Sequence, residues 1–173
     1  INSYKNRNIA LDYIIKNAKD DENILILITK IEHLRQTKMY IESKFKNKKV
    51  YEIYGGTEAE TREEIRKQLE KDSGSILVAT YGTFSTGSNV KKLHNIVLFS
   101  SYKSQIKILQ SIGRGLRKHE SKEFVTIWDN VDEIKYTDGK RKFKNWTYLH
   151  WEQNRLKYYD EQQFEYENYY LEI

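Results

Sequence analysis

The sequence of 173 residues contains no cysteine and no proline. The lack of cysteine excludes disulfides and thiolate metal sites, and it fits the reducing cytoplasm in which we expect this protein. The lack of proline leaves the turns to glycine, asparagine, aspartate and serine. No apolar run approaches the roughly 20 residues of a membrane span, and the polar start of the chain has no signal-peptide pattern. The four histidines lack metal-ligand spacing, so we expect no metal site.

Positive charge is unevenly distributed along the chain, whose net charge is +5. Residues 91–122 contain eight Lys or Arg and one acid, whereas residues 158–173 contain five acids and no base. A basic stretch of this kind is typical of a surface that binds a polyanion, and equally of a solvated face. Composition alone leaves both interpretations open.

Short apolar runs alternate with segments of helical periodicity. Residues 23–29 form one such run, which is typical of a strand buried on both faces of a parallel sheet. The whole pattern predicts strands at 23–29, 50–54, 76–80, 95–99 and 124–128, and helices at 8–18, 31–45, 57–70 and 104–112. We therefore expect an α/β fold with a largely parallel sheet flanked by helices.

Several residues receive specific places in this expected fold. Ile9, Tyr13 and Ile14 should face the core from the first helix. Thr57 and Glu60 match a capping box at the start of the third helix. Ligands of such sheets bind beyond the carboxyl ends of the strands, where four residues fall: Thr29, Tyr54, Thr80 and Ser100.

The pattern changes after Asp129, and we expect a main domain at residues 1–130 and an extension at residues 131–173. A polar loop or hairpin at 135–144 should precede a helix at 146–163, and the alternating tail at 164–173 predicts a strand. The aromatic side chains of the extension suit either stacking on nucleic-acid bases or packing onto the domain, and packing is favoured because aromatic residues dominate cores. They are Trp146, Trp151, Tyr158, Tyr159, Tyr169 and Tyr170.

The segment QSIGRGLR, residues 110–117, is the most informative part of the sequence. In a helix, Gln110, Arg114 and Arg117 would share one face, within an arc of roughly 60°. Two glycines inside a helix cost about 1 kcal/mol each relative to alanine, which indicates a close backbone approach there. By composition alone the polar face could be ordinary solvated surface. The apolar residues share another face, which we expect in the core: Leu109, Ile112 and Leu116.

The order Q-x-x-G-R-x-x-R closely resembles motif VI of superfamily 2 helicases. The resemblance implies the C-terminal of two RecA-like domains, whose arginines reach across a cleft to the γ-phosphate of ATP bound mainly by the other domain. It also implies that Arg117 is an arginine finger, that Arg114 is its partner, and that Gln110 contacts the nucleotide or the other domain. A planar, permanently charged guanidinium suits a phosphate oxygen, and such a finger is worth on the order of 10³–10⁵ in rate.

The segment ILVATYGTFSTGSN, residues 76–89, resembles motif V of the same family. The resemblance implies a threonine on the nucleic-acid backbone, and both Thr80 and Thr83 are candidates. It further implies a nucleotide contact near Gly87 and Asn89, to which Gly113 of motif VI is added. Asn89 stands where the family usually has aspartate, and the spacing from Thr80 to Gly87 is one residue longer, which leaves the ribose contact open.

Two weaker resemblances complete the family's order of motifs. Residues 24–30, which end in Thr29 and Lys30, resemble motif IV. Gly55 and Gly56, followed by Arg62, resemble the glycine turn and arginine-bearing helix that come next. The resemblance implies that Thr29, Lys30, Gly55 and Gly56 contact nucleic acid. The four segments together span just over half of the chain.

A phosphate-binding loop and a DEAD-like acidic box are both missing from the sequence. We therefore expect ATP and Mg²⁺ to bind mainly to an N-terminal half that precedes Ile1, and this chain alone to be inactive as an ATPase. Nucleic acid and that N-terminal half are the expected partners.

The stretch at residues 81–118 looks most like phage recombination helicases, near the XPB and RecG groups. That resemblance implies work on branched DNA in the host cytoplasm: fork regression, junction migration and unwinding of RNA–DNA hybrids. Two other interpretations stay open. One is a RecA-like binding or regulatory module without ATP chemistry, and the other is an unrelated flavodoxin-like or transferase domain.

Overall fold

A computed structural model describes residues 3–87, 90–102, 104–138 and 141–171 of the chain. A five-stranded sheet forms its centre, with the strand order β2-β3-β1-β4-β5 and every neighbouring pair parallel. The predicted α/β class and the largely parallel sheet are confirmed. The strands are β1 (Ile24–Ile28), β2 (Val50–Ile53), β3 (Ile76–Thr80), β4 (Asn95–Leu98) and β5 (Thr126–Asp129).

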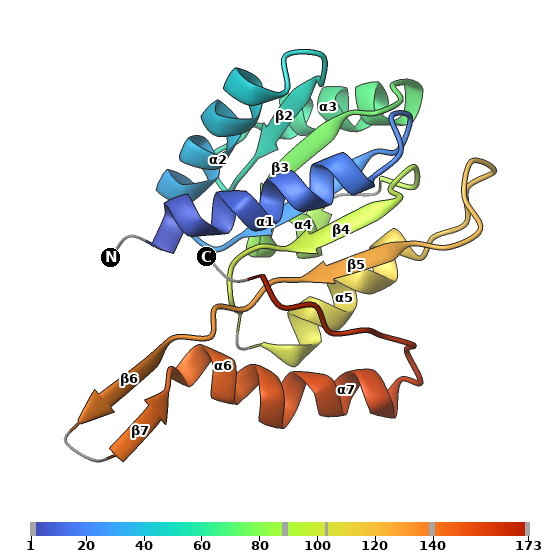
Figure 1. The fold of residues 1–173 in the computed structure, drawn as a ribbon. Coiled ribbons are helices and arrows are strands. Elements are labelled where there is room, and N and C mark those ends of the chain that lie inside the picture. Colours follow the sequence, from blue (N-terminus) through green and yellow to red (C-terminus); the bar gives the residue numbers. More distant parts are fainter. Residues whose placement is uncertain (1–2, 88–89, 103, 139–140, 172–173) are drawn as a thin grey trace.

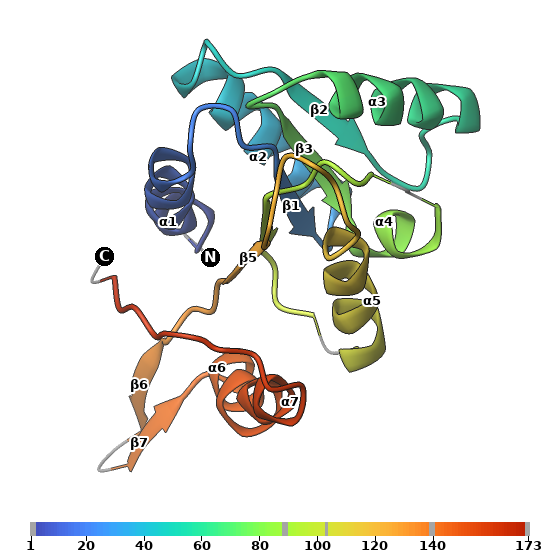
Figure 2. The ribbon, with the colours of Figure 1, turned by 90° about the vertical axis from the view of Figure 1, so that its right-hand side faces the viewer.

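Helices cover both faces of the sheet, with α1 and α2 on one face and α3, α4 and α5 on the other (Figure 1 and Figure 2). Their bounds are α1 (Ser3–Asn17), α2 (Ile31–Lys44), α3 (Ala59–Lys71), α4 (Tyr81–Gly87) and α5 (Gln105–Gly115). Successive side chains of a strand point to opposite faces. In β1, Leu25 and Leu27 pack on the α3–α5 side, whereas Ile24, Ile26 and Ile28 pack on the α1–α2 side. This double burial requires the continuous apolar run.

The buried face of α1 differs from the predicted one. Leu11, Ile14 and Ile15 are buried, whereas Ile9 and Tyr13 are 48% and 39% exposed. The predictions for Ile9 and Tyr13 were therefore wrong, and the prediction for Ile14 is confirmed. The buried residues follow the i, i+3, i+4 spacing of a single apolar stripe, which passes through Leu11 instead of Tyr13.

The start of α3 lacks the predicted capping box. The N-cap residue is Glu58, whose side chain makes no cap hydrogen bond. The Thr57 hydroxyl instead accepts the backbone N–H of Tyr54 at 3.0 Å. The predicted pairing of Thr57 with Glu60 was wrong because the Thr57 side chain closes the turn after β2.

A short helix that the pattern did not predict, α4, follows β3 directly. Its residues Tyr81 and Phe84 are 1% and 0% exposed. Because they lie three residues apart, one turn of helix brings both into the core. The segment that follows β3 is therefore anchored in the interior by these two rings.

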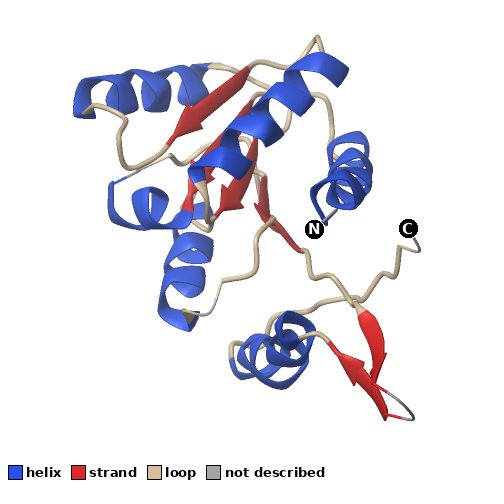
Figure 3. Ribbon diagram, turned by 90° about the vertical axis from the view of Figure 1, so that its left-hand side faces the viewer, coloured by secondary structure: helices blue, strands red, loops and turns tan. Residues whose placement is uncertain are grey.

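Beyond β5 the chain leaves the sheet and lies beside it (Figure 3). An antiparallel hairpin of β6 (Lys135–Asp138) and β7 (Arg141–Lys144) precedes a helical segment made of α6 (Trp146–His150), the π-helical η1 (Trp151–Arg155) and α7 (Leu156–Glu161). The predicted hairpin and helix are confirmed. The predicted tail strand was wrong, since residues 164–171 have no strand structure. In the part of the chain that the structure describes, no helix is both long and apolar enough to cross a membrane.

A buried carboxylate joins this helical segment to the sheet. Asp129, the last residue of β5, pairs with Arg155 and accepts hydrogen bonds from the Tyr159 hydroxyl at 2.8 Å and the Trp151 indole at 3.1 Å. Burial raises the pKa of Asp129, and the Arg155 charge opposes that rise. Arg155 also donates to the Tyr102 carbonyl at 3.2 Å. The indole N–H of Trp151 and the hydroxyl of Tyr159 thus both donate hydrogen bonds inside the protein, as expected for aromatic residues that pack onto the domain.

Candidate functional site

A hollow of about 530 Å³ opens at the carboxyl edge of β1, β2 and β3. Four of the six predicted nucleic-acid contacts meet there: Thr29, Gly55, Thr80 and Thr83. The other two, Lys30 and Gly56, are exposed beside these residues in sequence but do not line the hollow. The remaining lining residues are Ile31, Arg62, Tyr81, Gly82 and Tyr102.

Thr80 and Thr83 form one hydrogen-bonded pair at the base of α4. Thr80 is the last residue of β3, Thr83 lies in the first turn of α4, and their hydroxyl oxygens are 2.9 Å apart. Thr80 is half-buried, whereas Thr83 is only 7% exposed. Thr80 therefore offers more accessible surface to a ligand, while Thr83 orients its hydroxyl.

Arg62 supplies positive charge to the hollow. Its Nε donates to the Thr57 carbonyl at 2.8 Å, which anchors the guanidinium to the turn after β2. The side chain is half-buried and lines the hollow. In the sequence, Arg62 marked the arginine-bearing helix but was not counted among the contacts. Its place in the lining, together with Thr80 and Thr83, adds it to the candidate site.

Two stacked tyrosines form another part of the wall. The rings of Tyr81 and Tyr102 lie 4.6 Å apart at an interplanar angle of 13°. The Tyr81 hydroxyl donates to the Ser100 carbonyl at 2.9 Å, and burial raises the pKa of Tyr81. Ser100, which the sequence placed at a strand end, is buried, and its hydroxyl lies 3.3 Å from His33 Nδ1. Ser100 therefore supports the wall and does not line the hollow.

The inner face of α5 agrees with the predicted apolar face at Ile112 but not at Leu116. Ile108, Ser111, Ile112 and Gly115 are buried, whereas Leu116 is 53% exposed. The prediction for Ile112 is confirmed and that for Leu116 was wrong, because α5 ends at Gly115 and Leu116 is its C-cap residue. Leu109, which was also expected inside, is half-buried.

The two glycines of α5 differ in their surroundings. A Cβ on Gly115 would lie 2.2 Å from Ile96 Cδ1, whereas a Cβ on Gly113 would meet no atom within 4 Å. The predicted close backbone approach is therefore confirmed at Gly115 only. Gly113 is exposed, and its predicted nucleotide contact stays a prediction.

The arginines of the motif lie at the end of α5 and just beyond it. Gln110 is exposed and Arg114 is half-buried, one turn apart on the helix. Arg117 comes two residues after the last helical residue, and its N–H bonds to the Arg114 carbonyl at 3.4 Å. The prediction that Arg117 continues the helical face was wrong, because the helix stops at Gly115. Burial lowers the pKa of Arg114, and the neighbouring Arg117 charge lowers it further, so the two guanidinium groups interact.

The arginines and the hollow lie at opposite edges of the sheet. α5 begins after the Tyr102 segment at the carboxyl edge and runs back to the amino edge, where the Lys122 ammonium bridges the Gly115 and Leu93 carbonyls at 2.5 and 2.7 Å. α4 packs against α5 and ends at Gly87. Asn89, the other predicted nucleotide contact of that segment, lies outside the described residues.

The chain matches the helicase conserved C-terminal domain family over residues 6–119. The ATP-dependent DNA helicase uvsW of Enterobacteria phage T4 is 40% identical over 139 residues, which make up 78% of this chain and 27% of that protein. The chain therefore spans about a quarter of the length of this relative.

Solved helicase structures have the same fold. The crystal structure of T4 UvsW superimposes with a TM-score of 0.71 and 37% identity, covering 94% of this chain and 33% of that one. Domain 2 of the DEAD-box helicase Mss116p, solved bound to an RNA duplex, gives a TM-score of 0.59 and 18% identity over 73% of this chain and 48% of that one. The C-terminal part of the Fun30 ATPase domain superimposes with a TM-score of 0.62 and 16% identity, covering 71% of this chain and 40% of that one. The predicted RecA-like fold and the resemblance to the second domain of superfamily 2 helicases are confirmed. This chain belongs to the helicase conserved C-terminal domain family.

Proposed function

We propose that this chain is the C-terminal half of an ATP-dependent DNA helicase or translocase. It holds a nucleic-acid strand in the hollow at the carboxyl edge and supplies an arginine finger from the end of α5. The observation that carries the proposal is the convergence of Thr29, Gly55, Thr80 and Arg62 in one hollow. Thr29, Gly55 and Thr80 come from three different strand ends and Arg62 comes from α3, so only the fold brings them together.

The chemistry of the hollow suits a phosphate of the nucleic-acid backbone. Hydroxyl groups and a backbone turn can donate hydrogen bonds, and a guanidinium matches phosphate oxygens in charge and shape. Such contacts position a strand without reading its sequence. Thr80 and Arg62 are the proposed ligands, while Lys30 and Gly56 lie close enough in sequence to meet the flanking backbone.

The residues at the end of α5 suit the triphosphate of ATP. Arg117 is exposed, and the adjacent Arg114 provides a second guanidinium, so this end of the domain presents two positive charges. We assign Arg117 as the finger, Arg114 as its partner and Gln110 as a contact to the nucleotide or the other domain. ATP, with Mg²⁺, would supply the phosphoryl group that is transferred to water. A finger stabilises charge that develops during such a transfer.

The substrate is proposed to be branched DNA, in recombination and repair. This step rests on the likeness to the phage T4 DNA helicase, which extends over most of the chain. Fork regression, junction migration and unwinding of RNA–DNA hybrids are the corresponding activities. Measuring ATPase after the N-terminal half is added in trans would separate this proposal from a binding module without ATP chemistry, which would gain no activity.

A matched pair of arginines on α3 tests the strand site. Arg62 lines the hollow, whereas Arg66, one turn later, pairs with Glu63 on the surface. In the full-length protein, Arg62→Met should weaken binding to a labelled single strand and a forked duplex alike. It should also reduce the salt dependence of log K by roughly 0.7–0.9, the slope of one lost phosphate contact. Arg66→Met should change neither. An unchanged affinity and slope for Arg62→Met would exclude the hollow as the strand site.

A further inference from the structure

Lys122 fixes the base of the loop that follows α5. This loop, residues 116–122, contains Arg117 and is called the finger loop below. The Lys122 ammonium donates to the Gly115 carbonyl at 2.5 Å and to the Leu93 carbonyl at 2.7 Å. Gly115 ends α5 and Leu93 precedes β4. One side chain therefore closes the finger loop on itself and holds it to the sheet.

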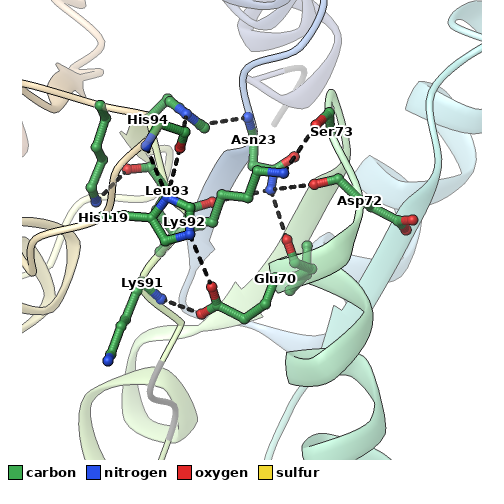
Figure 4. A network of polar contacts seen from close by, with 12 residues as sticks. Asn23, Glu70, Asp72, Ser73, Lys91, Lys92, Leu93, His94 and His119 are labelled. Atoms are coloured by element: carbon green, nitrogen blue, oxygen red, sulfur yellow. Dashed lines mark hydrogen bonds and ion pairs between the residues drawn. The ribbon is translucent and has the colours of Figure 1, made fainter.

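A chain of polar contacts holds the other side of the finger loop to the amino edge of the sheet, and part of it is seen in Figure 4. The Asn23 N–H donates to His94 Nδ1 at 2.9 Å, so the neutral ring carries its proton on Nε2, which lies 3.0 Å from Ser121 Oγ. The Ser121 hydroxyl lies 2.8 Å from His119 Nδ1, and His119 Nε2 lies 3.8 Å from a Glu70 carboxylate oxygen. Burial lowers the pKa of His94, which favours its neutral ring.

The same network supports residues 91 and 92, which lie shortly before β4. Glu70 accepts the Lys91 N–H at 2.5 Å, and the Asn23 side-chain amide donates to the Lys92 carbonyl at 3.0 Å. Lys92 in turn donates to the Ser73 hydroxyl at 3.0 Å. Figure 4 shows these residues gathered around His94 and His119. The finger loop and residues 91 and 92 therefore share their supports.

We propose that Lys122 is a positioning residue for Arg117, holding the finger loop so that the Arg117 guanidinium faces the γ-phosphate site of the other half. The inference rests on the proposed function, because it takes Arg117 as the finger. Lys122 itself contacts the carbonyls of Leu93 and Gly115.

The physical reason is that the Gly115 and Leu93 carbonyls would lose a charged hydrogen-bond donor if Lys122 were replaced. The last carbonyls of a helix have no partner within the helix, and a lysine near the C-terminus satisfies them and complements the helix dipole. Without the ammonium, the half-buried loop base would have to take up water. Burial already lowers the pKa of Lys122, which shows how closely the protein surrounds this group. The backbone on both sides of Arg117 would then gain freedom.

The first test measures the order of the finger loop directly. The Leu116 N–H bonds to the Ile112 carbonyl at 3.0 Å, and the Lys122 N–H bonds to the His119 carbonyl at 3.2 Å. In the full-length protein without nucleotide, Lys122→Met should speed amide exchange in peptides that cover residues 116–122 by roughly 10-fold, as expected for a lost charged hydrogen bond. Lys122→Arg, which keeps a charged donor, should restore most of the protection. Lys71→Met, which removes an exposed lysine of α3, should leave exchange unchanged. Unchanged exchange in Lys122→Met would overturn the proposal.

The second test asks whether Lys122 acts through Arg117. Lys122→Met should lower the kcat of nucleic-acid-stimulated ATPase by roughly 10- to 100-fold with little change in KM, since a misplacement of about 1 Å can cost on the order of 10²-fold. In an Arg117→Ala background, the same change should lower kcat by less than a factor of about 3, because residues that act as a unit are non-additive. A purely structural lysine would lower kcat by the same factor in both backgrounds, and that result would overturn the inference. An Arg117→Ala variant with normal kcat would instead overturn the proposed finger itself.

Discussion

Gly113 and Gly115 lie two residues apart in α5, yet an added methyl group should have opposite effects at the two positions. A Cβ on Gly115 would lie 2.2 Å from Ile96 Cδ1 and 3.3 Å from Ile96 Cγ1, with Val125 Cγ1 next at 3.6 Å. A Cβ on Gly113 would meet nothing within 4 Å. Ile96 is fully buried in β4, so its terminal methyl has little space into which to turn.

The size of each effect follows from helix propensity and packing. Gly113→Ala should stabilise the chain by about 0.5–1 kcal/mol, because alanine replaces glycine inside a helix. In Gly115→Ala, the gain in stability from helix propensity is at most the same. Against it stands the cost of overpacking a core, which is roughly 1–3 kcal/mol. The net result at Gly115 should be a loss of about 1 kcal/mol, since Ile96 can yield only in part. The two variants should thus differ by about 2 kcal/mol, or roughly 4–8 °C in Tm for a chain of this size.

Urea unfolding of the 173-residue chain, followed by far-UV circular dichroism, measures this difference. Both variants remove the same kind of residue from the same helix, so each is the control for the other. Equal midpoints for Gly113→Ala and Gly115→Ala would refute the reasoning, because they would mean that α5 does not approach β4 as closely as described. A Gly115→Ala variant more stable than Gly113→Ala would refute it for the same reason.

Other predictions concern catalysis, pH and the buried ion pair. Arg117→Ala in the full-length protein should lower the kcat of ATP hydrolysis by about 10³-fold or more with little change in ATP affinity, and Arg117→Lys should rescue it poorly; steady-state rates within a few-fold of wild type would contradict this. The chain alone should release no phosphate from ATP, which a phosphate-release assay with nucleic acid present would check. Burial, with the Arg7 charge, lowers the pKa of His33 from 6.5 to about 4. His33 therefore stabilises the fold fully above pH 6.5 and loses that contribution as the pH falls towards 4. Urea midpoints at pH 7 and pH 5 should differ less in His33→Gln than in wild type. Arg155→Met should cost about 3–5 kcal/mol of unfolding free energy, because Asp129 would stay buried without its partner; an unchanged urea midpoint would contradict this.

The sheet could be predicted from the sequence because its signal is local. Each strand is a short run of buried apolar residues, and the helices between strands leave only a parallel arrangement with helices on both faces. The strand-end positions follow directly, which is why Thr29 and Thr80 were placed at the carboxyl edge. The residue at which α5 ends could not be predicted in this way. The sequence does not show that Gly115 closes the helix, and so Arg117 was placed on a helical face that stops before it.

The supports of the finger loop could not be predicted because their signal is not local. Asn23 and His94 are 71 positions apart in the sequence, and Lys122 and Leu93 are 29 positions apart. In the sequence, Asn23 is an ordinary polar residue at the start of a predicted strand, and Lys122 is one basic residue in a basic stretch. Only the register of β1 with β4 brings the first pair together. The structure also gives one of the eight basic residues of this stretch a different role, since the Lys122 ammonium donates to two backbone carbonyls within the protein.

Helices α4 and α5 connect the two candidate sites, which are the hollow and the finger loop. α4 begins beside Thr80 in the hollow, and α5 begins just after Tyr102, which lines the same hollow. Both helices run away from the carboxyl edge and pack against each other. α5 has 11 residues and is therefore about 16 Å long. Because the interfaces of packed helices resist compression, α4 and α5 form a stiff connection between the hollow and the finger loop. The proposed function requires strand contact and phosphoryl transfer to be linked, and α4 and α5 are the elements that would link them between the two edges of one sheet.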